Sequence, residues 1–360
     1  MNTRRVEFLD GIRGLCALWV VLSHVWIFYH GLGPHHGVLG WLTNWLLYSH
    51  FAVDVFIVLS GYCLAISAYR NKPQAADFFR RRAIRILPPV FAALAAAIAV
   101  RAFAEGMGSI TAKNVFSNAL LLQDALPSSN VFDVPLWSVA VEWRLYFLFP
   151  LIFWALTSYL DRRGMVTVGA VAVGFGLTLT SPVVANCYPW FLGLFAAGVY
   201  AASDDVRPDR SALLAMAAGA FVVSQLVLYP INAVGESAMR PPLVDTGVGL
   251  LAAALLVVIR RQSTPVWVLT RRPLLFLGEI SFSLYLIHAV AAIVLFKVFK
   301  KLPAEWLTVD WVLVGFPLIF LAAFVFHRCV ERPSMRAAKS RARAVVVSTE
   351  EAQPEAAPVG

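Results

Sequence analysis

The sequence predicts an all-α fold, a polytopic bundle of about ten transmembrane helices. The chain of 360 residues is 59% hydrophobic and only 14% charged, whereas about a quarter of the residues in a soluble domain are charged. Apolar runs of about 20 residues, each long enough to cross the hydrocarbon layer of a bilayer, recur from one end of the sequence to the other. Helices satisfy their own backbone hydrogen bonds inside a membrane, so no strands are expected.

Ten apolar segments are the predicted spans, and they make residues 1–331 one transmembrane domain. The first segment lacks the small-residue cleavage site of a signal peptide and is followed at once by another span, so it is expected to stay in the membrane. The fifth and sixth are short and are separated by Ser181 and Pro182, so nine or eleven spans are the alternatives. The predicted spans are 11–30, 48–69, 85–104, 137–157, 165–181, 186–202, 211–229, 243–259, 274–296 and 308–327.

Positive charges in the loops predict the orientation of the chain. Of the 30 Lys and Arg residues, 22 fall in loops on one side of the predicted spans and six on the other. Loops rich in Lys and Arg stay in the cytoplasm, so both termini are predicted to be cytoplasmic, with the loop of Lys297, Lys300 and Lys301 as the discordant one. Residues 332–360 are basic and then rich in Glu, Ala and Pro, and they are predicted to be a disordered cytoplasmic tail.

Charge distribution and cysteine usage argue against two classes of function. The net charge of +9 does not indicate nucleic-acid binding, because Lys and Arg occur in short clusters between apolar runs, as in the loops of a membrane protein. The four cysteines are scattered singly and form no CxxC pair. They therefore indicate neither a metal site nor a disulfide framework.

The longest stretch outside the predicted spans lies between 105 and 135 and is expected to face outward. Its middle, residues 115–122, is expected to form a short helix at the membrane surface. Long ordered loops in compact proteins are often functional.

Ionisable residues inside a span are costly to bury and are therefore candidates for function. Arg13 and His24 lie 11 residues apart in the first span, which on an ideal helix is about 20° beyond three full turns and a rise of about 16 Å. Both side chains are thus expected on one face, with Arg13 near the cytoplasmic boundary and His24 near mid-membrane. Asp10 can hold Arg13 through an (i, i+3) contact. The alternative is a packing histidine and an arginine that reaches the membrane surface.

Arg82 and Arg85, at the start of the third span, share a helix face. Guanidinium groups bind phosphate oxygens through paired hydrogen bonds, so the two residues are candidates for a phosphate site at the cytoplasmic mouth. The alternative is an ordinary cationic loop, because such loops flank the spans of most membrane proteins.

Two other spans carry polar residues that are expected to need partners. Asp54 in the second span is expected to pair with an arginine or histidine on a neighbouring helix. Tyr285 and His288 in the ninth span share a face, and a packing histidine is an equal alternative there.

Glu142 in the fourth span lies one helical turn after Ser138 and is expected on the same face. A local pairing with Arg144 at the outer mouth is one interpretation, although residues two apart do not face each other on a helix.

Five segments resemble motifs of the acyltransferase-3 family. They occur in the same order as in the family and extend over most of the chain. One departure is that Trp143 and Arg144 follow Glu142, where the family commonly has Glu-Glu or Glu-x-Gln, which puts an amide contact there in doubt. The sequence is also expected to be a stand-alone form, without the appended hydrolase-like domain that some relatives carry. The segments are residues 8–14 with His24 (an R-x10-H pattern), 53–61, 82–88, 136–142 with Tyr146, and 281–288.

The resemblance implies transfer of an acyl group, usually acetyl, from cytoplasmic acyl-CoA to a hydroxyl of a cell-surface or lipid-linked glycan. It implies a multi-pass protein of the bacterial inner membrane, with acyl-CoA, the acceptor and the bilayer as partners, and no metal or cofactor beyond the acyl-CoA substrate. The acceptor and the acyl chain length stay open. The competing class is a transporter or flippase, against which stands the lack of internal repeats and paired broken helices.

The resemblance also implies roles for the candidate residues. His24 is expected to act as the general base, with a covalent acyl-histidine step as the less favoured variant, and Arg13 is expected to anchor the donor beside it. The expected donor-binding residues are Asp10, Arg82 and Arg85, and the expected residues of an acceptor or structural polar site are Asp54, Glu142, Tyr285 and His288.

Overall fold

The computed structural model describes residues 4–31, 37–71, 74–126, 135–203, 240–261, 266–299 and 311–338, with a few single positions between them. Within these ranges every regular element is helical, which confirms the predicted fold class for the part of the chain described. The longer helices are α1 (Arg4–His30), α3 (His50–Asn71), α4 (Ala75–Glu105), α6 (Leu136–Ser158), α7 (Arg163–Thr178), α9 (Phe191–Ala201), α11 (Arg240–Arg261), α13 (Arg272–Phe299) and α15 (Phe316–Phe326). The shorter ones are α2 (Gly37–Thr43), η1 (Asn44–Tyr48), η2 (Met107–Ser109), α5 (Ala112–Ala119), η3 (Leu160–Arg162), α8 (Pro182–Ala185), α12 (Val266–Leu269), η4 (Trp311–Gly315) and η5 (His327–Glu331).

Seven of the described helices are long and apolar enough to cross a membrane: α1, α3, α4, α6, α11, α13 and the continuous helix Trp311–Ala338 that contains α15. They correspond to seven of the ten predicted spans. The predicted fifth span is α7, with 16 residues, and the sixth is α9, with 11 residues. Eleven helical residues extend about 16 Å, about half the hydrocarbon thickness, so α9 by itself is too short to be the complete sixth span that was predicted. The predicted span 211–229 lies almost entirely outside the described residues.

Two predictions about the connecting and terminal segments have different outcomes. In the long loop, α5 confirms the short helix expected near 115–122, although it begins at Ala112. The side chain of Thr111 caps it by accepting a hydrogen bond from the backbone of Asn114 at 3.2 Å, which satisfies one of the free N–H groups of a helix start. At the other end of the chain, the last helix continues to Ala338 and so includes the first residues of the predicted tail; residues 341–360 lie outside the described part.

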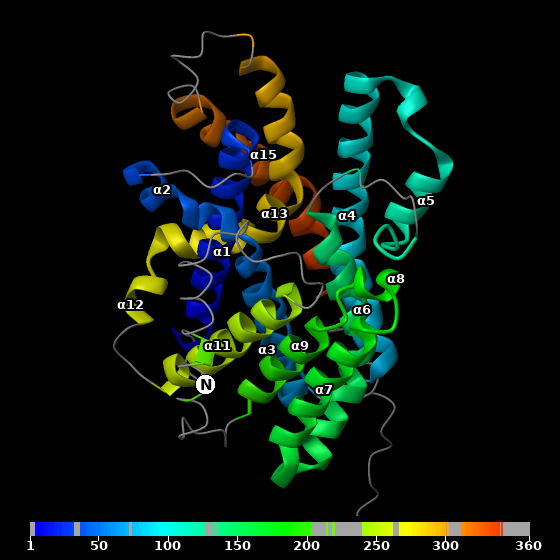
Figure 1. Cartoon of the computed structure of the whole chain (residues 1–360), viewed down its shortest axis with the longest axis vertical. Coiled ribbons are helices and arrows are strands. Elements are labelled where there is room, and N and C mark those ends of the chain that lie inside the picture. Colours follow the sequence, from blue (N-terminus) through cyan, green and yellow to red (C-terminus); the bar gives the residue numbers. More distant parts are fainter. Residues whose placement is uncertain are drawn as a thin grey trace, which may run out of the picture.

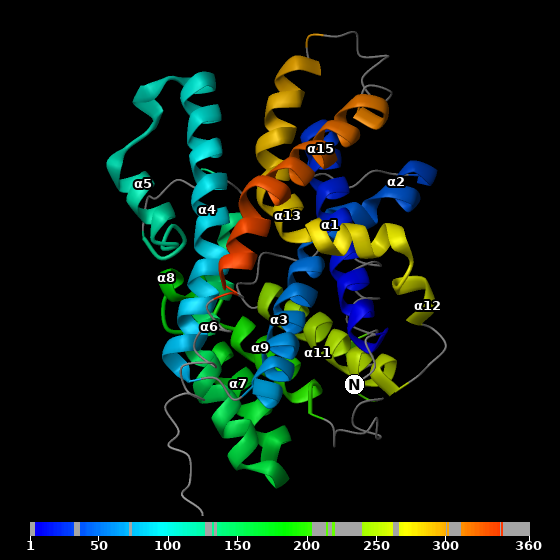
Figure 2. The ribbon, with the colours of Figure 1, turned by 180° about the vertical axis from the view of Figure 1, so that it is seen from behind.

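The long helices pack around α1 and α3 at the centre of the molecule (Figures 1 and 2). Helix α1 packs against α13 and α3, and α3 also packs against α9 and α11. In both views α4 and α5 stand along one edge, and α12 lies at the opposite edge. The interior between α1, α3, α6 and α13 is therefore where the ionisable residues of these helices meet. The predicted cytoplasmic location of the termini stays a prediction.

Candidate active site

Helices α1 and α13 approach each other closely because glycines lie where they cross. A Cβ atom at Gly278 would sit 2.1 Å from the carbonyl oxygen of Asp10, and one at Gly14 would sit 2.8 Å from the backbone nitrogen of Gly278. Glycine lacks that atom and so permits this backbone approach. His24 follows Gly14 by ten residues, and His288 follows Gly278 by ten. These equal offsets, about 15 Å along each helix, bring the two histidines to the same level.

The two imidazoles contact each other directly. His288 Nε2 lies 3.1 Å from His24 Nδ1, and the ring centroids are 5.0 Å apart. His288 is fully buried, and its Nδ1 lies 2.8 Å from the carbonyl oxygen of Tyr285 and 3.0 Å from that of Leu284. His24 Nδ1 also lies 3.0 Å from the carbonyl oxygen of Val20. Apart from the imidazoles themselves, the hydrogen-bond partners of the pair among the described residues are thus backbone carbonyl oxygens.

These acceptors assign the tautomers of a neutral pair. A carbonyl oxygen only accepts, so His288 Nδ1 carries its proton and donates to the backbone, which leaves His288 Nε2 as an acceptor. The proton between the rings then belongs to His24 Nδ1, which donates to His288 and to Val20. His24 Nε2 is therefore left with a free lone pair, as a general base requires.

A chain of hydroxyl and carboxyl groups continues from the histidine pair along α6. The hydroxyl groups of Tyr285 and Ser138 are 2.6 Å apart. One and two turns further on, Glu142 and Tyr146 lie on the same face of α6. Glu142 Oε1 accepts hydrogen bonds from Ser60 Oγ at 2.6 Å and from the hydroxyl of Tyr146. Ser138 and Glu142 thus lie on one face of α6, as expected. From this face Ser138 contacts α13 and Glu142 contacts α3.

Arg13 on α1 is held close to this network by contacts with two helices. Its Nη1 donates to Asp10 Oδ1 at 3.2 Å, which confirms the expected (i, i+3) contact. Its Nη2 donates to Cys63 Sγ on α3, also at 3.2 Å. Arg13 further interacts electrostatically with Glu142. Residues of α1 and α3 together thus position the guanidinium. An arginine that only reaches the membrane surface would not need such contacts.

Arg82 approaches the same carboxylate from α4. Its guanidinium lies 5.8 Å from the ring centroids of Phe78 and of Tyr146, a cation–π distance. It also interacts electrostatically with Glu142, and with Arg85 one turn further along α4. Glu142 therefore interacts with both Arg13 and Arg82, two of the residues expected to bind the donor.

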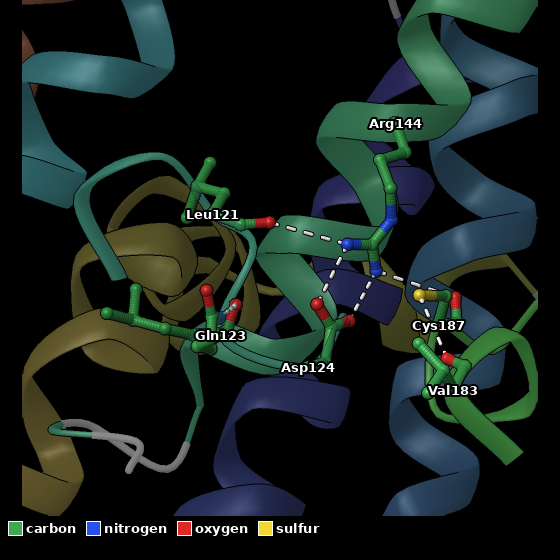
Figure 3. A network of polar contacts seen from close by, with 7 residues as sticks. Leu121, Gln123, Asp124, Arg144, Val183 and Cys187 are labelled. Carbon is green, nitrogen blue, oxygen red and sulfur yellow. Dashed lines mark hydrogen bonds and ion pairs between the residues drawn. The ribbon is translucent and has the colours of Figure 1, made fainter. Parts of the chain in front are cut away.

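Arg144 does not pair with Glu142, so the interpretation of a local pair was wrong. Its guanidinium binds both carboxylate oxygens of Asp124, with Nη1 2.9 Å from Oδ1, and it donates to the carbonyl oxygens of Leu121 at 3.3 Å and Cys187 at 3.4 Å (Figure 3). The reason is helix geometry, because a side chain two residues from Glu142 points to another face. Arg144 therefore fastens the long loop and the segment after α8 to α6.

The Cys187 thiol, which lies outside the long apolar helices, is half-buried at the edge of this network. Its Sγ donates to the carbonyl oxygen of Val183 at 3.4 Å (Figure 3). Burial raises the pKa of the Cys187 thiol above its ordinary value, against a smaller lowering by Arg144. A thiol with a raised pKa carries little thiolate near neutral pH, so Cys187 is not suited to act as a nucleophile.

Asp54 is not part of the histidine site. It is completely buried, and neither of its carboxylate oxygens has a hydrogen-bond partner among the described residues. The titratable groups beside it are His50 on its own helix and Asp245 on α11. Among the described residues no arginine or histidine from a neighbouring helix pairs with Asp54, and α11 supplies a second carboxylate instead.

A further buried polar cluster joins α13 to the last helix, and the sequence reasoning missed it. His327 Nδ1 lies 2.9 Å from Glu331 Oε2, and Ser283 donates to the same oxygen. The (i, i+4) spacing of a histidine and a glutamate in an apolar helix was the available signal. It was overlooked because the predicted span ended at 327.

The described part of the chain is thus a helical membrane protein whose long helices bring together a pair of histidines and, further along, two arginines near Glu142. The family model described as an acyltransferase domain matches residues 6–328. The chain belongs to this family, acyltransferase-3, which confirms the resemblance of its motifs.

Each individual relative matches only about half of this chain. The acyltransferase MdmB of Streptomyces mycarofaciens is 28% identical over 191 residues, which are 51% of this chain and 48% of MdmB. Nodulation protein 10 of Rhizobium leguminosarum bv. viciae is 28% identical over 177 residues, 47% of this chain and 42% of that protein. The O-acetyltransferase OatA of Staphylococcus aureus (strain NCTC 8325 / PS 47) is 24% identical over 181 residues, 46% of this chain and 27% of OatA. The chain thus spans less than half the length of these curated relatives, and no solved structure matches it.

Proposed function

We propose that this protein is an integral-membrane O-acyltransferase that moves an acyl group, with acetyl favoured, from cytoplasmic acyl-CoA to a hydroxyl of a cell-surface or lipid-linked glycan. The observation that carries the proposal is the His24–His288 pair, in which hydrogen bonding leaves His24 Nε2 free to accept a proton. Family membership supports acyl transfer as the reaction class. One matched relative is named an O-acetyltransferase, which favours acetyl and a hydroxyl acceptor.

The proposed reaction uses His24 as a general base. His24 Nε2 removes the proton of the acceptor hydroxyl while the oxygen attacks the thioester carbonyl carbon of the donor. The tetrahedral intermediate collapses with cleavage of the C–S bond, and the departing CoA thiolate takes the proton from His24. His288 keeps His24 in the required tautomer, as the partner of a catalytic imidazole commonly does. Ester and free CoA are the products.

The arginines are proposed to bind the phosphates of the donor. Arg13, Arg82 and Arg85 are the candidate cations, and a guanidinium binds phosphate through two parallel hydrogen bonds. Asp10 and Glu142 neutralise part of this positive charge until the donor binds. Because a long pantetheine arm separates the phosphates of CoA from its thioester, the rise of about 16 Å from Arg13 to His24 along α1 suits binding at one end and reaction at the other.

The proposal is tested by measuring acyl transfer by a variant that lacks the His24 imidazole. Purified protein in detergent is incubated with radiolabelled acetyl-CoA and cell-envelope extract, and both released CoA and labelled envelope material are measured. His24→Ala is expected to abolish transfer while leaving acetyl-CoA binding intact. Transfer at the wild-type rate by a folded His24→Ala protein would exclude His24 as the base. His30→Ala, at the end of the same helix, is the matched control and is expected to keep its activity.

Donor binding is tested separately by thermal unfolding. A ligand that binds only the folded state raises its unfolding temperature, so acetyl-CoA is expected to stabilise the wild type. Arg82→Gln is expected to weaken this stabilisation, and the exposed Arg80→Gln is the matched control on the same helix. A protein that acetyl-CoA does not stabilise at any concentration would favour a transporter over an acyltransferase.

A further inference from the structure

Three potential metal ligands meet where α3 begins, in a place separate from the histidine pair. His50 is the first residue of α3, Asp54 follows one turn later, and Asp245 comes from the neighbouring α11, which lies beside α3 in Figures 1 and 2. One ligand atom of each residue lies within 4.8 Å of the other two. His50 Nε2 is 3.0 Å from Asp245 Oδ2.

The surroundings offer few hydrogen-bond donors to the two carboxyl groups of this cluster. Asp54 is 0% exposed, and both of its oxygens lack a hydrogen-bond partner among the described residues. Its neighbour Asp245 is 1% exposed, and the donors that reach Asp245 Oδ2 are His50 and Trp190 Nε1, the latter at 2.8 Å. A buried carboxylate without a partner is strongly unfavourable, and a second carboxylate beside it adds repulsion. A cation between the two would remove both penalties.

The distances within the cluster are compatible with three ligands of one shared ion. Adjacent ligands of an ion bound at about 2.1 Å are about 3.0–3.4 Å apart, and opposite ligands are about 4.2 Å apart. The 3.0 Å between His50 and Asp245 agrees with adjacent ligands. Asp54 makes no hydrogen bond to either residue, yet one of its oxygens lies within 4.8 Å of a ligand atom of each.

We propose that His50, Asp54 and Asp245 bind one divalent cation of the class that accepts imidazole and carboxylate ligands together, Zn²⁺ or Mn²⁺. A single imidazole among the ligands favours these ions over Mg²⁺ and Ca²⁺, which prefer oxygen. The ion has a route to the site, since the side chain of His50 is 36% exposed.

The ion has a structural role next to the candidate active site. The ring of His50 stacks on Trp137 with centroids 5.3 Å apart and an interplanar angle of 8°. Trp137 directly precedes Ser138, which contacts Tyr285 beside the histidine pair. Asp54 and Ser60 lie on the same helix, α3. A bound cation therefore fixes α3 against α11 and steadies the contact of α3 with α6.

Metal content and thermal unfolding of the full-length protein test this site without any acyl-transfer assay. The protein is purified through a tag that uses no metal resin, and its metals are quantified by mass spectrometry. One bound Zn²⁺ or Mn²⁺ per chain is expected. EDTA is expected to lower the unfolding temperature, and Zn²⁺ or Mn²⁺, but not Mg²⁺ or Ca²⁺, to restore it.

Variants assign the ion to these ligands. Asp54→Asn and Asp245→Asn are expected to lose the metal and the response to EDTA, whereas Asp161→Asn, a change of an exposed carboxylate, is expected to keep both. A wild type that carries no metal and does not respond to EDTA would overturn the proposal, as would metal retained in full by both ligand variants. If the variants fail to fold, the wild-type measurement alone decides.

Discussion

The close crossing of α1 and α13 provides a direct test of how the histidine pair is positioned. Gly278→Ala adds a Cβ atom whose position is 2.1 Å from the carbonyl oxygen of Asp10, whereas ordinary contacts begin near 3.4 Å. Backbone and not a flexible side chain occupies that space, so the two helices must separate by about 1 Å. Overpacking of this kind costs about 1–3 kcal/mol of stability.

The same displacement acts on the imidazoles further along the two helices. A shift of about 1 Å would lengthen the 3.1 Å contact between His24 and His288 beyond hydrogen-bond range. Misplacement by about 1 Å can lower a catalytic rate about 100-fold. We therefore expect Gly278→Ala to unfold several degrees below the wild type and to lose most of its acyl transfer.

Two quantities are measured. Thermal unfolding in detergent is monitored by size-exclusion chromatography with fluorescence detection, and acyl transfer is monitored by the release of CoA from acetyl-CoA. Gly169→Ala is the matched control, because a Cβ atom at that position in α7 meets nothing within 4 Å. Alanine in an unhindered helix position is expected to raise stability by up to about 1 kcal/mol. If Gly278→Ala unfolded at the wild-type temperature and kept its activity, the geometry of the crossing would not set the histidine pair.

Four other changes have defined expectations. Removing the ring of His288 (His288→Ala) is expected to lower the turnover of acyl transfer about 10- to 100-fold, with an unchanged Michaelis constant for acetyl-CoA; an unchanged turnover would refute the tautomer assignment. Glu142→Gln keeps the shape but not the charge that interacts with the arginines, so the affinity for acetyl-CoA measured by thermal shift is expected to change while the fold persists. Asp124→Asn breaks the double contact with Arg144 and is expected to cost about 1–3 kcal/mol, since the pair is mostly shielded from water; unfolding at the wild-type temperature would show that other contacts hold the loop. Alkylation of Cys187 by a maleimide, followed by mass spectrometry, is expected to be slow at pH 7.5 and to accelerate above pH 9, because the pKa of its thiol is raised; rapid labelling at pH 7 would contradict this.

The sequence was sufficient for those features that depend on local periodicity. Apolar runs predicted seven of the helices that can cross a membrane, and helical spacing predicted the contact between Asp10 and Arg13. It also put Ser138 and Glu142 on one face of α6. In each case the relevant residues lie within a turn or within one helix, so 3.6 residues per turn determines the outcome.

The partners across helices could not be obtained in this way. His24 and His288 are 264 positions apart, and His50 and Asp245 are 195 apart. Their meeting depends on which helices pack together and at what register, which a single sequence does not specify. The candidate metal ligands escaped detection for the same reason, since only His50 and Asp54 share a segment and they form no known motif. Arg144 was misassigned because its partner Asp124 lies in a loop whose path no periodicity predicts.

Each histidine follows its crossing glycine by ten residues, so the segments Gly14–His24 and Gly278–His288 must keep the same length. One residue inserted between Gly14 and His24 would turn His24 by about 100° about the axis of α1 and move it about 1.5 Å along that axis. The same insertion in α13 would not restore the pair, because it would turn His288 away as well. The interval of ten residues is therefore fixed in both helices, and substitutions between glycine and histidine should be tolerated far better than insertions or deletions.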